Sequence, residues 1–241
     1  MKRIFFPLML LFVISLLPSC RSNGKMTVSD LKANKSNFDP VYILEKNEYS
    51  PYIVVSNNYN GNTLLLRKEV LENSKRFNSY SSLYEGSEID DYLNGEFLSR
   101  LGDYSAIIKK TAIEVTKDSS IGCSGQETYF IERKVFLLSY YEVCSDKNSN
   151  AAKEGAHLNF FRKDENRIAL KSGQTHSWWL RTPDTYYMSC PYCVATNGKI
   201  DAPNAFDFCG VRPAFCVSGN TPIVKTSIAM GKQSAFVLQA P

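Results

Sequence analysis

The sequence is short of the residues that most often carry catalysis and cofactor binding. It contains only two histidines, His157 and His176, and two tryptophans among 241 residues. It has no Gly-x-Ser-x-Gly nucleophile motif and no glycine-rich phosphate loop of the P-loop type. The sequence therefore gives no motif-based reason to expect a serine hydrolase or a P-loop nucleotide enzyme.

Charge of one sign and long hydrophobic runs are also scarce. The formal net charge is +4, and no basic stripe is present, so the sequence does not indicate nucleic-acid binding. With 44% hydrophobic and 22% charged residues, the composition excludes a disordered chain or a coiled coil. The length suits one domain, or one domain with a tail.

The N-terminus resembles an export signal. Lys2 and Arg3 precede an apolar run, Ile4 to Leu17, that is too short and too interrupted by proline to span a membrane well. The run ends in Leu16-Leu17-Pro18-Ser19-Cys20, which resembles a bacterial lipobox. We therefore predict a lipoprotein signal peptide over residues 1–19, lipidation of Cys20, a polar tether over 20–38 and one domain over 39–241. The alternative is an ordinary cleaved signal that happens to lie near Cys20.

The pattern along the remaining chain predicts an α+β fold. Tyr52 to Ser56 and Thr63 to Arg67, separated by Asn60-Gly61, indicate a β-hairpin. Ser87 caps a helix whose apolar residues recur every four positions, although Asn94-Gly95 can divide it in two. Val194 to Asp201, with Asn197-Gly198 at a type I′ turn, is the clearest hairpin. We expect short helices in the first half and a small antiparallel sheet with long loops in the second.

Six cysteines remain if Cys20 carries lipid. An even number in an exported chain favours disulfides, with free thiols or a metal site as alternatives. Cys190 and Cys193 have the spacing of a metal knuckle, but the next two cysteines do not supply a second one. The disulfide candidates are Cys123, Cys144, Cys190, Cys193, Cys209 and Cys216.

Two further groups can be interpreted chemically. His176 with Cys190 is a conceivable nucleophile pair, but His176 is more simply a polar loop residue. An acidic run can hold a cation or supply paired carboxylates, but a solvated helix N-terminus explains it better. The run comprises Glu85, Glu88, Asp90 and Asp91.

Three motifs carry a family resemblance. Lys134 to Ser139, Trp178-Trp179-Leu180-Arg181-Thr182-Pro183 and Gly210-Val211-Arg212-Pro213-Ala214-Phe215 resemble a bacterial family known only as a domain of unknown function, number six-two-seven-three. The similarity covers Val41 to Val217. The arrangement is also similar to C-type-lectin-like folds, which place a long variable loop between a Trp-containing strand and a Gly-x-Arg strand. The residues that carry calcium-dependent sugar binding or formylglycine-generating chemistry in those groups are not matched here.

The resemblance implies that the variable loop is Asp184 to Cys209. Its tyrosines and small polar residues are typical of a binding surface, although a decorative loop braced by disulfides has the same composition. The candidate ligand-binding residues are Trp179, Tyr186, Tyr187, Tyr192, Asn197, Asp201, Asn204 and Asp207. Trp178, Arg181, Gly210 and Arg212 are expected to be structural, with the arginines bonded to carbonyls or a buried carboxylate.

These observations predict an exported protein anchored to the cell envelope by lipid at Cys20, with a non-catalytic domain that binds a glycan, envelope or protein ligand. We expect no cofactor and no nucleic-acid partner. An exported enzyme using a Cys/His or metal site in residues 176–216 is the competing function. A purely structural envelope protein is the third.

Overall fold

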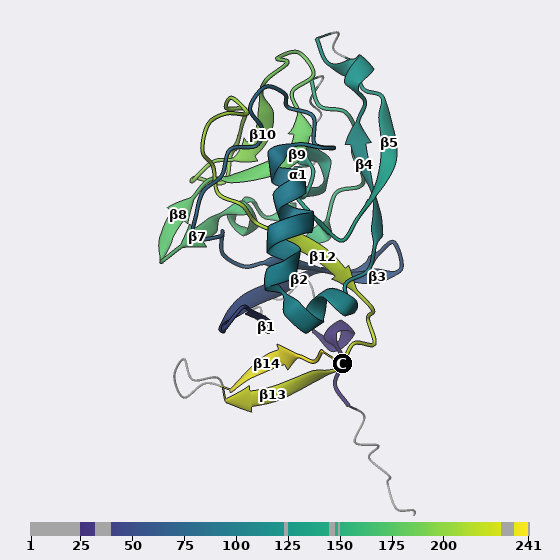
Figure 1. The fold of residues 1–241 in the computed structure, drawn as a ribbon, viewed down its shortest axis with the longest axis vertical. Helices are drawn as coiled ribbons and strands as arrows, with labels where there is room; N and C mark the ends of the chain where they lie inside the picture. The colour runs from purple at the N-terminus through teal and green to yellow at the C-terminus, as the bar shows by residue number, and fades with distance from the viewer. Residues whose placement is uncertain are drawn as a thin grey trace, which may run out of the picture.

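The protein is described here from a computed structural model, which describes residues 25–31, 40–122, 125–144, 148, 150–227 and 234–240. The fold is α+β and is dominated by sheet (Figure 1). The predicted signal peptide, Cys20 and Cys123 lie outside the described residues. Within those residues, no helix is long and apolar enough to cross a membrane.

The largest sheet has seven strands and joins the two ends of the chain. Its order is β13-β14-β1-β2-β3-β12-β6, and every neighbouring pair is antiparallel except β1 and β14, which are parallel. The largest sheet is therefore not the small antiparallel sheet predicted for the second half, because three of its strands come from the first half. The strands are β1 (Val41–Glu45), β2 (Glu48–Tyr59), β3 (Asn62–Arg67), β6 (Val135–Phe136), β12 (Ala214–Val217), β13 (Ile223–Ser227) and β14 (Ser234–Leu238).

The predicted hairpin at Asn60-Gly61 is present and is longer than expected. Asn60 has φ 50° and Gly61 has φ 77°, the two positive values that a type I′ turn requires. Asn60 Nδ2 also donates to the carbonyl of Ala112, 2.8 Å away, so the turn is held against β4 (Thr111–Thr116). By contrast, only Gly198 has positive φ in the Asn197-Gly198 turn, so that turn is not of type I′.

One helical segment lies over the main sheet (Figure 1). It begins with α1 (Glu88–Tyr92), passes through a π-helical turn, η2 (Leu93–Phe97), and ends in α2 (Leu98–Arg100) without a break. Ser87 caps it by accepting the N–H of Asp90. The expected interruption at Asn94-Gly95 is a π turn, in which Asn94 Nδ2 donates to Val135 O and Asn94 Oδ1 accepts from Val135 N.

Smaller sheets form the other end of the molecule. The sequence did not predict several of their strands. A three-stranded sheet has the order β11-β10-β9, and two hairpins pair β4 with β5 and β7 with β8. Their bounds are β5 (Thr128–Arg133), β7 (Ala169–Lys171), β8 (Gln174–His176), β9 (Trp178–Pro183), β10 (Pro191–Val194) and β11 (Ile200–Asp201). The helical turns are α3 (Tyr140–Val143), η1 (Val28–Asp30), η3 (Gly102–Ala106), η4 (Asp118–Ser120), η5 (Asn159–Arg162) and η6 (Asp164–Arg167).

Part of the expected tether belongs to the folded body. Val28 is fully buried, and its N–H donates to the carbonyl of Thr221 at 2.9 Å. Thr27 forms an isolated bridge with Pro222. Residues 25–31 therefore pack against the segment before β13, a contact between distant parts of the chain that composition does not reveal.

Strand β9 is covered on both faces. Trp178 and Trp179 are both 0% exposed, and all six residues of the strand are buried. Trp178 Nε1 donates to Arg167 O and Trp179 Nε1 donates to Lys75 O, so each indole N–H is satisfied inside the protein. The expectation that Trp179 faces a ligand is wrong, because alternation along a strand exposes one face only when that face lacks a covering layer.

Candidate functional site

Asp184 shapes the segment that follows β9. Its carboxylate accepts the N–H groups of Tyr186 and Tyr187 at 2.9 and 3.2 Å, and its own N–H donates to Cys190 O at 2.8 Å. The Tyr192 hydroxyl donates to the second carboxylate oxygen at 3.1 Å. These bonds form an Asx-type turn that closes the segment 184–190 and turns its central side chains outward.

The outward side chains belong to what we call the aromatic surface. Its members are large apolar residues that are more than half exposed, from two stretches of the chain. The two stretches are joined where Ala205 N donates to Ser189 O at 2.7 Å. The members are Tyr186 (59%), Tyr187 (57%), Met188 (67%), Phe206 (53%) and Phe208 (67%).

The predicted polar ligand residues divide into two groups. Asn204 and Asp207 are exposed on the second stretch, where Asp207 Oδ2 accepts the N–H of Asn204 at 3.1 Å. Asn197 lies in the hairpin turn, whose Gly198 lies close to Asp164 O, and its side chain accepts from Lys199 N. Asp201 lies on β11, where it is the strand partner of Cys193 on β10. The structure therefore places Tyr186, Tyr187, Asn204 and Asp207 on the two joined stretches, but not Asn197 or Asp201.

Tyr192 supports the loop from beneath and is not part of the exposed surface. It is 5% exposed and packs on Tyr140 with 4.9 Å between ring centroids. Its hydroxyl donates to Asp184 and accepts from Asn148 Nδ2 at 2.8 Å. Burial and the Asp184 carboxylate raise the pKa of this hydroxyl above its ordinary value, so it remains a hydrogen-bond donor.

Sequence reasoning missed Asp184 and the exposed Met188, Phe206 and Phe208. The signal for Asp184 was present, because an aspartate directly after a strand and before two tyrosines fits an Asx turn. Phe206 and Phe208 alternate with Asp207 in a segment with no other strand pattern. The contact between Ala205 and Ser189 places them beside the segment 186–188, and sequence alone does not supply that contact.

Arg181 lies at the centre of a buried ionic network. Its guanidinium donates to Glu142 at 2.8 and 3.1 Å, and its Nε lies 3.5 Å from Glu154 Oε2; all three side chains are 0% exposed. It also donates to the carbonyls of Glu114 and Leu137. Burial alone lowers the pKa of Arg181, but the two carboxylates outweigh it and the pKa is raised. The network links β9, α3 and the segment after α3.

Arg212 is buried in a different way. Its Nε donates to Arg67 O at 2.8 Å, and its guanidinium lies 5.0 Å from the Trp178 ring centroid. Burial lowers its pKa to about 9. The neighbouring Gly210 admits no side chain, because a Cβ there would lie 2.4 Å from Ser177 O. Both residues thus fasten the segment before β12, Gly210 against β9 and Arg212 against β3 and the Trp178 ring.

Four cysteines in the described part of the chain have free thiols, so the disulfides expected among them are not formed in this structure. Cys193 and Cys209 interact with each other, which raises the pKa of Cys193 and lowers that of Cys209. Cys209 Sγ also contacts Ser177 Oγ at 3.1 Å. Cys190 faces Asn204 Oδ1 at 3.8 Å, and burial raises the pKa of Cys216 to about 12. The four are Cys190, Cys193, Cys209 and Cys216, and the further candidate Cys144 is buried.

The residues proposed for chemistry have other partners. His176 Nδ1 lies 2.8 Å from Ser177 O, whereas Cys190 contacts Asn204. Asp90 is 2% exposed and accepts hydrogen bonds of 2.8 to 3.0 Å from Arg133, so it is not a solvated helix carboxylate as expected. Glu88 pairs with Arg76. No group of three or more metal-ligating side chains is found among the residues that the structure describes.

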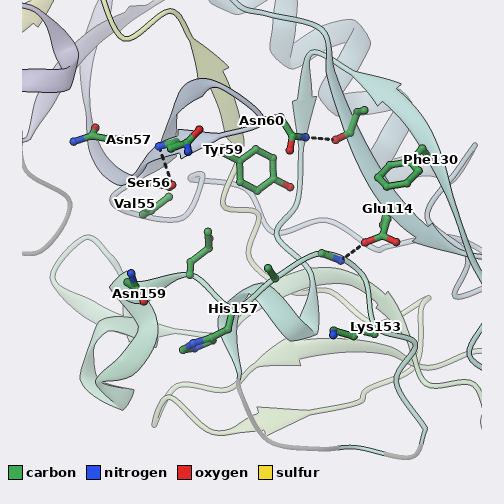
Figure 2. A pocket seen from close by; sticks show the side chains of 15 residues that line it. Val55, Ser56, Asn57, Tyr59, Asn60, Glu114, Phe130, Lys153, His157 and Asn159 are labelled. Carbon is green, nitrogen blue, oxygen red and sulfur yellow. Dashed lines mark hydrogen bonds between the residues drawn. The ribbon is translucent and has the colours of Figure 1, made fainter.

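A cleft of about 1040 Å³ lies elsewhere on the molecule, and the sequence did not indicate it (Figure 2). One wall is the end of β2 and its turn, residues 55–60. The opposite wall is the segment 153–159. The β4–β5 hairpin completes the lining of the cleft with Ala112, Glu114 and Phe130. The cleft shares none of its lining residues with the aromatic surface.

Comparison with known proteins places the chain in a family without naming an activity. No curated protein and no solved structure matches it. The model of one family matches residues 60–219, which include the β2–β3 turn, the helix and both Arg-containing motifs. The chain therefore belongs to the family described as Domain of unknown function (DUF6273).

Proposed function

We propose that this protein is a non-catalytic binding module of the bacterial cell envelope, whose aromatic surface contacts a protein ligand. In this proposal a lipid at Cys20 holds the module at the membrane. The domain is C-type-lectin-like, and its long segment 184–209 runs from the Trp-containing strand β9 to the Gly-x-Arg motif that precedes β12. The cluster of exposed side chains on that segment is the observation that carries the proposal.

The composition of the aromatic surface favours a protein over a glycan as its ligand. Aromatic residues and methionine are enriched at protein interfaces, and clustered exposed apolar residues mark interaction sites more often than scattered ones. Tyr186 and Tyr187 pack edge to face at 5.0 Å, so their rings offer contact area that is already ordered. Asn204 and Asp207 supply polar groups beside them.

The competing proposal, an exported enzyme in residues 176–216, has less support. It requires a histidine or metal to activate a cysteine, and His176 and Cys190 have separate partners. Burial also raises the pKa of Cys190, which lowers its nucleophilicity at neutral pH.

The test uses the chain from residue 21 onward, with a Tyr187→Ser/Phe208→Ser double variant. Tyr49→Ser is the matched control, because Tyr49 is 40% exposed and lies on β2 in the main sheet. Binding is measured to a bacterial envelope fraction that is untreated, protease-treated or periodate-treated. We expect protease and the double variant to abolish binding, while periodate and Tyr49→Ser leave it unchanged.

Loss of binding after periodate alone would assign a glycan ligand. Equal binding by the wild type and the double variant would overturn the proposal.

A further inference from the structure

The cleft between residues 55–60 and 153–159 is lined by an unusual set of side chains. Four of its lining residues are asparagines, Asn57, Asn58, Asn60 and Asn159, and all four are exposed, although the Asn57 amide donates to Ser29 O and Leu31 O outside the cleft. Glu114 and Lys153 supply one charge of each sign. A side-chain amide both donates and accepts hydrogen bonds, as a hydroxyl group does. The lining therefore matches a ligand with many hydroxyl groups and little net charge.

Phe130 gives the cleft an apolar face. It lies on β5 and is 67% exposed, although neighbouring positions of the β4–β5 hairpin, such as Ile113 and Ile131, are buried. An aromatic face carries partial negative charge and attracts polarised C–H groups. Sugar rings present such C–H groups on one face and hydroxyls around the edge. The view in Figure 2 shows Phe130 and Glu114 on one side of the hollow and Lys153 and His157 below.

The polar groups are partly fixed before any ligand arrives. Asn60 Nδ2 is bonded to Ala112 O, which orients its Oδ1, and Asn58 Oδ1 accepts from Gly61 N at 3.2 Å, which orients its Nδ2. Glu114 accepts from Gly155 N at 2.7 Å and from Thr128 Oγ1 at 3.1 Å. These bonds lower the entropy lost on binding.

Both walls rest on the buried network around Arg181. The Tyr59 hydroxyl donates to Glu142 from one wall, and Leu158 N donates to Glu142 O at 3.0 Å from the other. Glu154, which precedes Gly155, accepts from Thr116 N and Oγ1 at 2.8 and 2.6 Å. Because the walls are tied to fully buried groups, the cleft is preformed.

We propose that this cleft binds a neutral oligosaccharide, with Phe130 under the apolar face of one sugar ring and the asparagine amides bonded to its hydroxyls. Its volume of about 1040 Å³ accommodates more than one ring. The site uses β2, β4 and β5 and the segment 153–159, so it is separate from the aromatic surface. Either proposal can fail without the other.

The experiment measures binding of neutral tetrasaccharides of glucose, mannose, galactose and N-acetylglucosamine to the chain from residue 21 onward, by calorimetry and by amide chemical shifts. A galacturonic acid tetramer is the charged probe. Phe130→Ala and Asn58→Ala are the test variants, because both side chains are exposed. Tyr187→Ser, on the aromatic surface, is the matched control.

We expect at least one neutral tetrasaccharide to bind, with a loss of about tenfold or more in Phe130→Ala and a smaller loss in Asn58→Ala. Tyr187→Ser should bind as the wild type does. Failure of the whole neutral panel, binding of the charged tetramer alone, or a loss in Tyr187→Ser but not in Phe130→Ala would each overturn the proposal. A second variant, Phe130→Leu, retains bulk and tests whether the aromatic face itself is needed.

Discussion

Arg181 and Tyr186 are five positions apart in the chain, yet their surroundings have little in common. The Arg181 side chain is 0% exposed, donates to Glu142 and to two carbonyls, and forms an ion pair with Glu154, whereas the Tyr186 side chain is 59% exposed. Asp184, between them, fixes the backbone of the exposed turn. The interior network therefore determines where the segment emerges, and the aromatic surface contributes little to holding the fold.

This contrast separates stability from binding. Removing one partner of a buried ion pair leaves an uncompensated charge, which is costly, whereas exposed side chains without buried contacts can change at little cost. Variants of the network should unfold the protein more easily without a specific effect on contacts made by the aromatic surface. Variants of the aromatic surface should weaken binding of its ligand and leave the free energy of unfolding nearly unchanged.

The largest expected effect is that of Arg181→Met, which leaves Glu142 and Glu154 buried without their cation. We expect a loss of about 3–5 kcal/mol in the free energy of unfolding, measured by urea denaturation. Arg76→Met is the control, because Arg76 is 44% exposed and pairs with an exposed glutamate. A loss below about 1 kcal/mol for Arg181→Met would mean that the network does not hold this end of the fold.

Cys193 and Cys209 are both buried, and their thiols interact. Treatment with diamide should join these two residues and leave Cys216 reduced, as read by peptide mass mapping. The loop-entropy model gives about 3 kcal/mol of added stability for a ring of this size. A Cys193→Ser variant should show no such gain, and a disulfide from Cys216 to either residue would contradict the observed arrangement.

Asp184→Ala tests the link between the two regions. The change removes the acceptor for two backbone N–H groups and the Tyr192 hydroxyl. We expect a loss of about 1–2 kcal/mol in unfolding free energy and faster hydrogen exchange at the amides of residues 186 and 187. Asp207→Ala is the control, because Asp207 is exposed and accepts from one backbone N–H.

The pH dependence of stability should report the buried Glu154. Burial raises its pKa above 4.5 in spite of Arg181, so the folded state binds a proton more tightly than the unfolded state does. The stability that this proton adds to the folded state is therefore fully present below the pKa of Glu154 in the unfolded chain. It is lost as pH rises through the pKa of Glu154 in the folded protein. Glu154→Gln should remove this component from the curve of unfolding free energy against pH. If the two curves are parallel above pH 4.5, the shift is absent.

The smallest effect on stability is expected at the aromatic surface. Phe208→Ser should change the unfolding free energy by less than about 0.5 kcal/mol, because the ring is 67% exposed and its described contact is a distant guanidinium, 5.6 Å away. By contrast, Phe97→Ser, on the buried face of the helix, should lower the unfolding free energy strongly. A large loss for Phe208→Ser would show that the ring supports the fold.

Local patterns were sufficient for much of the secondary structure. The Asn60-Gly61 turn and the Ser87 cap were predicted because turn and cap chemistry depends on a few adjacent residues. The spacing of Ile89, Leu93, Phe97 and Leu101 identified a face that is fully buried. The Asn197-Gly198 turn differed, since only Gly198 takes a positive φ there, and a Cβ at Gly198 would lie 3.1 Å from Asp164 O.

The candidate site was predicted only in part. Tyr186, Tyr187, Asn204 and Asp207 were identified from composition, but Trp179 and Tyr192 are buried because other layers cover them. The cleft was missed because its walls come from segments about a hundred residues apart and the rest of its lining from the β4–β5 hairpin. No local sequence pattern predicts which distant segments will lie next to one another.

By itself, the sequence determined the family, the short-range turns and caps, and the presence of buried arginines in two motifs, since these depend on nearby residues or on the motifs themselves. Only the tertiary structure decided which carboxylates pair with Arg181, which aromatic rings are exposed, which thiols touch, and that a cleft exists. The physical reason is that burial and pairing are properties of the neighbours that packing brings together, and most of those neighbours are distant in the chain.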